Sequence, residues 1–163
     1  MNCVNCGAVL RLVEGRGHFV CDYCAAVRPL DGPPAEGVDG LTAAATPTDA
    51  ACPTCNQALH AAVLDGWSVS TCRACSGILV PRSAFGKIVA ARRAAAAGPE
   101  ITPRPIDPAE FSRTLRCPRC HERMEVHPYY GPGAVVIDSC NACGVVWLDR
   151  GELRAIEQAP GKR

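Results

Sequence analysis

Twelve cysteines, arranged as six CxxC pairs, are the feature that most constrains how this chain folds. A CxxC turn presents two thiolates from one tight loop, and two such turns facing each other complete the tetrahedral shell of a structural zinc ion. Within each couple of turns the intervening stretch is 14, 16 or 19 residues, which suits a hairpin that brings the turns together. The sequence therefore predicts three four-thiolate zinc ribbons and three Zn²⁺ ions, with these ligand sets: Cys3, Cys6, Cys21 and Cys24; Cys52, Cys55, Cys72 and Cys75; Cys117, Cys120, Cys140 and Cys143.

Other uses of these cysteines are less consistent with the pattern. Disulfides belong to oxidising compartments, and the opening MNCVNCG places no secretory leader before Cys3. A thioredoxin-like dithiol needs one CxxC in a βαβ unit rather than six in hairpins. Iron in a rubredoxin-like site has the same four thiolates, so ligand type leaves iron open, although a closed thiolate shell favours zinc. Pairing between couples also stays open, but local hairpins make sequential pairing simpler.

The apolar residues predict several small cores instead of one large one. Much of the 48% hydrophobic fraction is Ala, Cys and Val, and the chain has only three Phe, two Trp and three Tyr. A module of about 25 residues is below the roughly 40 at which a chain usually needs a metal or disulfides to fold. Metal binding and folding are therefore expected to be one event.

The formal charge of +1 treats the thiols as neutral. Twelve bound thiolates and three Zn²⁺ ions lower it to about −5, which argues against a general basic field. Residues 52–97 nevertheless carry five Lys or Arg against one Asp, so a basic face is expected on the second module. No apolar run approaches the roughly 18 residues of a membrane span, so a soluble protein of the reducing cytosol is expected.

The first module, residues 1–30, is expected to be a zinc ribbon with strands over 9–13 and 18–20 around a glycine-containing turn at 14–17. Residues 31–51 are rich in Pro, Gly, Ala and Thr without hydrophobic periodicity. They are predicted to be a flexible linker.

The second module, residues 52–97, combines a zinc ribbon with a helix. Residues 58–64 and 67–71 read as strands around the turn Asp65-Gly66, and residues 82–97 have helical spacing after Pro81. Residues 98–112 follow as a proline-rich linker through which no long helix can run.

The third module, residues 113–160, repeats this plan with strands over 124–127 and 134–139 and a C-terminal helix. Asp149 and Glu152 have the spacing of a capping box at the start of that helix. Leu153 and Ile156 are expected to face inward, with Trp147 beside them. Modules two and three are predicted internal copies, because CPTC matches CPRC and CRACSGILV matches CNACGVVWL.

The string CPRC, a hairpin and CNACGVVWLDRGEL resembles the bacterial transcription factor IIB-type zinc-ribbon (zf-TFIIB) family, whose members have CPxC and then CxxCGGVWLDxGEL. The resemblance is close over 116–157 and looser over 52–90, whereas residues 1–30 resemble only a generic zinc ribbon. Val145 replaces the second glycine of the family motif. In the second module Leu79, Pro81 and Ala84 stand at the Trp, Asp and Glu positions. The resemblance implies zinc binding.

Residues outside the metal shells are expected to have ordinary roles. His18, His60, His121 and His127 are surface or hairpin residues because each shell is already filled, and His121 is a candidate to hydrogen-bond near the shell. Capping explains Asp149 and Glu152 without acid–base chemistry. A solvated helix face explains Arg82, Lys87, Arg92 and Arg93 better than phosphate binding does, because no aromatic residues alternate with them. No catalytic residues are identified, and the chain is expected not to be an enzyme.

Two functions remain as hypotheses. The first is a non-enzymatic zinc-ribbon adaptor that presents hairpin edges and the surfaces of Trp147 and Phe85 to a protein partner. The second is a transcription-associated protein that binds nucleic acid through Arg82, Lys87, Arg92 and Arg93. A redox or metal-delivery protein is a third and more remote hypothesis, because it requires labile thiols.

Overall fold

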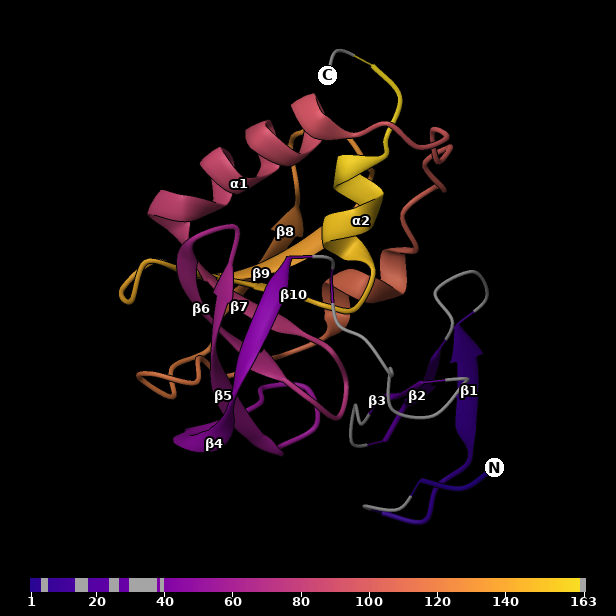
Figure 1. The fold of residues 1–163 in the computed structure, drawn as a ribbon. Helices are drawn as coiled ribbons and strands as arrows, with labels where there is room; N and C mark the ends of the chain where they lie inside the picture. The colour runs from indigo at the N-terminus through magenta and orange to yellow at the C-terminus, as the bar shows by residue number, and fades with distance from the viewer. Residues whose placement is uncertain (4–5, 14–17, 24–26, 30–37, 39, 162–163) are drawn as a thin grey trace.

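The computed structural model describes residues 1–3, 6–13, 18–23, 27–29, 38 and 40–161, and Figure 1 shows the arrangement of its elements. In chain order these are β1 (Leu10–Val13), β2 (His18–Cys21), β3 (Val27–Pro29), β4 (Leu41–Ala51), β5 (Ala58–Leu64), β6 (Trp67–Cys72), β7 (Ile78–Pro81), α1 (Arg82–Ala95), the 3-10 helix η1 (Pro108–Ser112), β8 (Glu125–Pro128), β9 (Val136–Cys140), β10 (Val145–Leu148) and α2 (Glu152–Glu157).

The strands form two antiparallel sheets. A small sheet has the order β1-β2-β3, and a seven-stranded sheet has the order β4-β5-β6-β7-β10-β9-β8. The central contact of the larger sheet pairs β7 of the second module with β10 of the third. Modules two and three are therefore one continuous sheet.

The two faces of this sheet carry two different cores. Alternate residues of a strand point to opposite faces, so Ile78 and Val80 lie in one core and Leu79 lies in the other. We name the first the helix-face core, because α1 and α2 cover it side by side (Figure 1). Its buried members are Ala62, Leu64, Val69, Ile78, Val80, Ala84, Phe85, Ile88, Val89, Val135, Ile137, Val146, Leu148, Leu153 and Ile156.

The opposite face holds what we name the cysteine-face core. Cysteines of the second and third modules, together with Trp147, lie there in one apolar cluster. Its buried members are Cys52, Cys55, Leu59, Cys72, Cys75, Leu79, Leu115, Cys117, Met124, Cys140, Val145 and Trp147. These two shared cores correct the prediction of separate small cores. Modules with few bulky side chains gain buried apolar area by packing against each other.

The two copies meet with approximate twofold symmetry. Leu79 is the fourth residue after the last cysteine of its module, and Trp147 is the fourth after the last cysteine of the next. These equivalent residues lie opposite each other in the antiparallel pairing of β7 and β10. Equivalent positions that pair in antiparallel strands define a local dyad, which here runs between Leu79 and Trp147.

Trp147 and Gly77 are complementary across this dyad. Trp147 is fully buried, and a Cβ added to Gly77 would lie 2.1 Å from its indole ring. The symmetry-equivalent pair is Leu79 and Val145, where a smaller side chain leaves room for a larger neighbour. The departure of Val145 from the family motif therefore matches the departure of Leu79 in the other module.

Several local predictions are confirmed. The helix predicted over 82–97 is α1, and its Phe85, Ile88 and Val89 are buried. The turn at Asp65-Gly66 has φ values of 50° and 84°, as a tight hairpin turn requires. The strands predicted in modules two and three match β5, β6, β8 and β9 within two residues at each end. Leu153 and Ile156 are buried as expected, but Trp147 lies in the opposite core and not beside them.

The prediction of a flexible linker over 31–51 is wrong for residues 41–51. They form β4, which pairs with β5 and has register shifts on either side of Pro47. Most of its side chains are exposed because it is an edge strand, so hydrophobic periodicity does not mark it. Residues 31–37 and 39 lie outside the described residues.

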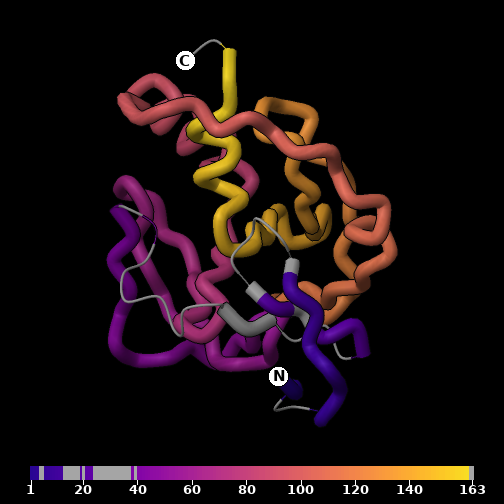
Figure 2. Tube along the Cα trace, turned by 90° about the vertical axis from the view of Figure 1, so that its right-hand side faces the viewer, coloured from indigo at the N-terminus to yellow at the C-terminus, as the bar shows by residue number. Residues whose placement is uncertain are grey.

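Residues 98–112 contain no α-helix, as predicted, but they are anchored to the fold. The Ile101 N–H donates to the Gln158 carbonyl at 2.7 Å, and the Asp107 carboxylate caps η1 by accepting from Ala109 N–H at 2.9 Å. Figure 2 follows this stretch along the outside of the molecule.

In the first module, β1 and β2 match the predicted strands and β3 is an addition. The turn at 14–17 lies outside the described residues. Among the helices of the described ranges, none has the length and apolar character needed to cross a membrane.

Gly77→Ala is expected to lower the free energy of unfolding of the zinc-loaded protein by about 2–3 kcal/mol, because the new methyl group collides with Trp147. Gly86→Ala is the matched control. Its Cβ meets nothing within 4 Å, and it should stabilise helix α1 by about 0.5–1 kcal/mol. Chemical denaturation of both variants measures the difference.

Trp147→Leu should relieve part of the Gly77→Ala cost, so the double variant should lose less stability than the two single losses combined. Strict additivity would contradict the proposed complementarity.

Candidate metal centres

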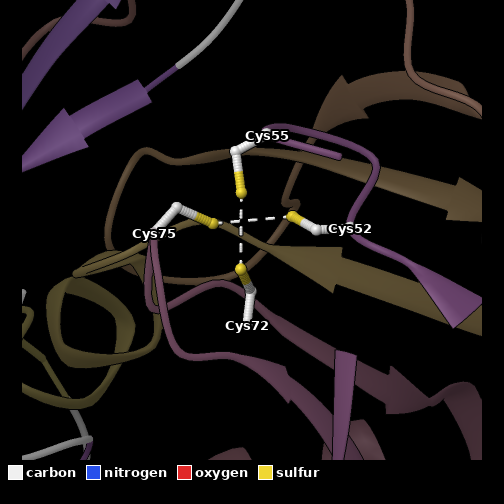
Figure 3. Close-up of side chains that lie close together, drawn as sticks. All are labelled: Cys52, Cys55, Cys72 and Cys75. Atoms are coloured by element: carbon white, nitrogen blue, oxygen red, sulfur yellow. Dashed lines mark hydrogen bonds between the residues drawn. The ribbon is translucent and has the colours of Figure 1, made fainter. Parts of the chain in front are cut away.

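The sulfurs of the second module converge on one point (Figure 3). Cys52 faces Cys75 with their Sγ atoms 3.6 Å apart, and Cys55 faces Cys72 at 3.4 Å. The third module has the same arrangement, with the Sγ atoms of Cys120 and Cys140 3.6 Å apart. A Zn–S distance of about 2.3 Å in a tetrahedron places sulfurs roughly 3.8 Å apart. Both groups of four therefore fit a tetrahedral metal ion with little adjustment.

In the CxxC turns whose two cysteines the structure describes, the backbone places both sulfurs on the same side. In the first turns of all three modules and the last turn of the second, the residue after the second cysteine donates its N–H to the carbonyl of the first, at 2.8–2.9 Å. The structure describes the residue after the second cysteine in five turns, and its φ is left-handed there, at 59–78°. These residues are Gly7, Asn56, Ser76, His121 and Gly144. Two of the five are glycines, which adopt this conformation without steric cost.

Hydrogen bonds among the four thiols of the second site shift their pKa values in opposite directions. The pKa of Cys72 is held well below its usual range, first by its hydrogen bond with Cys52 and then by those with Cys55 and Cys75. The pKa of Cys75 is raised, mainly by its hydrogen bond with Cys52. In the third site a hydrogen bond with Cys120 raises the pKa of Cys143 to about 12. A bound divalent cation would replace these protons and deprotonate the set.

The first module brings together Cys3, Cys6 and Cys21, and the Sγ atoms of Cys6 and Cys21 are 3.4 Å apart. Its predicted fourth ligand, Cys24, lies outside the described residues. None of the eleven described cysteines forms a disulfide. The structure thus has two four-cysteine sites and one three-cysteine site that suit zinc.

The two complete sites differ in exposure. All four cysteines of the second site are buried, whereas Cys120 and Cys143 of the third are only half-buried. Both sites border the same apolar cluster around Trp147. A metal ion bound at either site would therefore help to hold a core that the other site also borders.

Asp149 connects the two modules through its carboxylate. It accepts hydrogen bonds from Trp147 Nε1 at 2.9 Å and from the Thr54 hydroxyl of the second site's loop at 3.3 Å. It also forms an ion pair with Arg113, whose guanidinium pairs on its other side with the fully buried Asp138. Asp149, which stands at the Asp position of the family motif, is thus the centre of a polar network next to the cysteine-face core.

Burial and charge oppose each other in this network. Burial raises the pKa of Asp138 to about 6, even though the Arg113 charge acts in the opposite direction. Burial by itself would lower the pKa of Arg113, but the charges of Asp149 and Asp138 raise it above its usual value. Sequence reasoning missed Thr54, Arg113 and Asp138. A lone Asp in the apolar strand AVVIDS is the signal that could have identified Asp138 as a buried, paired charge.

The capping-box prediction is confirmed for one of its two bonds. The Glu152 carboxylate accepts from Asp149 N–H at 2.8 Å. The N-cap position is Gly151, with φ 87° and no side-chain cap. The Asp149 carboxylate instead contacts Trp147, Thr54 and Arg113.

His60 and His127 have side-chain hydrogen bonds to groups other than the sulfurs, and the side chain of His18 lies outside the described part of the chain. His60 Nδ1 lies 3.1 Å from the Ala44 carbonyl, and His127 contacts the Pro128 carbonyl and the Ser139 hydroxyl, both at 3.0 Å. His121 is exposed and contributes its backbone to the CxxC turn. Every group of described residues that suits a metal consists of cysteines alone.

The basic residues of α1 have different surroundings. Arg92 forms a two-pronged ion pair with Asp65 at 2.5 and 2.9 Å and reaches Glu157 at 3.3 Å. Arg93 is buried and donates to the carbonyls of Ile156 and Ala159 at the end of α2. Lys87 lies 5.2 Å from the centre of the Trp67 ring, and Arg82 is exposed. The expectation of a solvated helix face is therefore wrong for Arg92 and Arg93, which hold the fold together.

Trp147 and Phe85 do not form the exposed surfaces that the adaptor hypothesis expects. Trp147 is fully buried, and only 7% of Phe85 is exposed. The adaptor hypothesis presents both to a protein partner, whereas the structure buries them. Packing of modules two and three into one sheet covers both side chains.

Comparison with known proteins places two segments in one family. The family model described as transcription factor zinc-finger, a TFIIB-type zinc ribbon, matches residues 51–91 and 116–159, which together make up just over half of the chain. Each matched segment contains one complete four-cysteine site. No curated protein and no solved structure matches the chain.

Chelation is expected to remove metal from the third site before the second, because two of the third site's sulfurs are accessible and all of the second site's are buried. Native mass spectrometry of zinc-loaded protein during EDTA titration, combined with mapping of alkylated cysteines, measures the order. Cys72→Ser and Cys140→Ser each remove a ligand of one site and assign the signals. Early alkylation of Cys72 or Cys75 would contradict the expected order.

Asp149→Ala should lower the free energy of unfolding by about 2–4 kcal/mol, because it leaves the Trp147 N–H and the partly buried Arg113 without this acceptor. Asp149→Asn, which keeps an acceptor for Trp147, should lose less. Asp49→Ala removes an exposed carboxylate and should change stability by less than about 0.5 kcal/mol. Denaturant unfolding of the zinc-loaded proteins distinguishes these outcomes.

Proposed function

This chain belongs to the transcription factor zinc-finger family, and from that premise we propose that it is a non-enzymatic zinc-binding adaptor for a protein partner. The family match supports zinc binding, and the adaptor role is our inference from the surroundings of the cysteine sites. The observation that carries it is the cysteine-face core, in which two sets of four thiolates lie within one apolar cluster.

Such closed shells favour a structural role for the metal. A catalytic zinc site keeps a position open for water or substrate, whereas four thiolates fill a tetrahedral shell. The sites also lie in the core that joins the two modules, where a metal ion stabilises folding directly. We therefore assign three Zn²⁺ ions to the chain, with Cys24 completing the first site. All-thiolate zinc sites need reduced cysteines, so a reducing compartment such as the cytosol is the expected location.

Charge favours a protein partner over nucleic acid. With three zinc ions and twelve thiolates the formal charge of the chain is about −5. Arg92 and Arg93, two of the residues suggested for phosphate contacts, are paired with acidic side chains or helix carbonyls instead. A long polyanion would meet a net negative molecule whose internal arginines are already engaged.

Zinc-loaded protein used as bait should capture a specific set of proteins, and the capture should resist nuclease treatment. The Cys72→Ser and Cys140→Ser variants should fail to capture that set, because loss of either metal loosens the shared core. Quantitative mass spectrometry of the captured material measures both effects. Recovery of nucleic acid with no specific protein would instead support the transcription-associated alternative.

A further inference from the structure

A groove of about 850 Å³ lies beside the edge of the large sheet, between the start of α1 and strands β8, β9 and β10. None of the cysteines of the two four-cysteine sites lines it. Its volume falls within the range of sites that accept a small ligand or a few side chains.

The floor of the groove is apolar. It includes Phe85 from α1, Ile137 from β9 and Val146 from β10, whose side chains are almost buried in the helix-face core. Phe85 is fixed by edge contact with Tyr129, with ring centres 5.4 Å apart. An apolar side chain entering the groove would therefore meet a preformed hydrophobic surface.

The rim of the groove is basic and aromatic. Arg82 and Arg123 line it and are exposed, and neither forms an ion pair with a carboxylate in the described part of the chain. The carboxylate of the rim, Glu125, accepts a hydrogen bond from the Asn141 amide at 2.7 Å. Tyr130 is 88% exposed and stacks on His127, with ring centres 6.1 Å apart. This arrangement contrasts with Arg92 and Arg93, whose guanidinium groups have partners within the fold.

The neighbouring sheet edge is poorly suited to adding a strand from a partner. Met124 N–H already donates to the Leu115 carbonyl at 2.9 Å, and Pro128 in β8 has no N–H. Because these two positions have no free backbone N–H group, the edge offers few hydrogen-bond donors to an added strand. Recognition at this groove must therefore depend on side chains.

We propose that the groove binds an acidic segment of a protein partner in which an aromatic or large aliphatic residue is flanked by Asp or Glu. The apolar residue would occupy the floor, and its acidic neighbours would pair with Arg82 and Arg123. This inference rests on the adaptor function proposed above and names the chemistry of its partner. Because the zinc-loaded chain has a formal charge of about −5, attraction for an acidic segment must come from local charge, which Arg82 and Arg123 supply at this groove.

The test uses zinc-loaded full-length protein and an array of 12-residue peptides with one central Phe, Leu or Trp flanked by Asp and Glu. Control peptides replace the acidic residues with Ser or the central residue with Gly. Binding should require both features and should weaken as salt increases. The double variant Arg82→Glu, Arg123→Glu should reduce the affinity of the best peptide at least about tenfold.

Lys87→Glu is the matched control, because it reverses a charge on the same helix at a residue that does not line the groove. It should leave peptide affinity unchanged. Zinc content and circular dichroism of each variant establish that it is folded. Equal binding by the groove variant and the control would overturn the proposal, as would selection of peptides without acidic residues.

Fluorescent dT12 is the nucleic-acid arm of the experiment. Binding of dT12 that depends on Arg82 and Arg123 and displaces the peptides would identify a nucleic-acid groove and overturn the proposal. The pull-down tests the adaptor function separately from its assignment to this groove. Proteins still captured by the Arg82→Glu, Arg123→Glu variant at wild-type levels would leave the adaptor function standing and refute its assignment to this groove.

Discussion

The seven-stranded sheet and its two cores depend on cysteine sulfurs that must be brought close together and whose negative charge must then be neutralised. Four thiolates within 4.8 Å of one another repel each other unless a cation or shared protons compensate their charge. Two such groups border a single cluster with Trp147, Leu79 and Val145. Metal ions bound at these two sites would thus be charged centres at the border of an apolar core that includes Leu79 of β7 and Trp147 of β10.

The two modules are copies that have diverged in a complementary way. Across the local dyad, Gly77 leaves space for the indole of Trp147, and the equivalent Val145 lies in the same cluster as the smaller Leu79. Only one tryptophan is needed to fill the centre of the interface. The family-type Asp and Glu survive in the third module alone, where Asp149 also reaches Thr54 in the loop of the second site. Divergence of the second copy therefore reflects its role as the complementary half of one core.

The arginines divide into two groups with different physical roles. Arg92, Arg93 and Arg113 satisfy carboxylates and helix carbonyls that would otherwise lack partners, and they join elements distant in the sequence. Arg82 and Arg123 face a groove and are open to solvent. Of the five basic residues in 52–97, Arg92 and Arg93 are used inside the fold, whereas Arg73, Arg82 and Lys87 are exposed. The surface charge available to a partner is smaller and more localised than composition indicates.

The sequence by itself determined the features that depend on neighbours in the chain. The described CxxC turns, the Asp65-Gly66 hairpin and helix α1 follow from local hydrogen bonds, backbone conformation and periodicity. The cysteine clusters and most strands of modules two and three were therefore predictable. Only the tertiary structure decided that β7 pairs with β10, that residues 41–51 form an edge strand, and that Trp147 and Phe85 are buried. These outcomes depend on contacts between segments far apart in sequence, where backbone pairing and buried area leave little local pattern. The same holds for Arg113 and Asp138, which are 25 residues apart and acquire their roles only when the sheet brings them together.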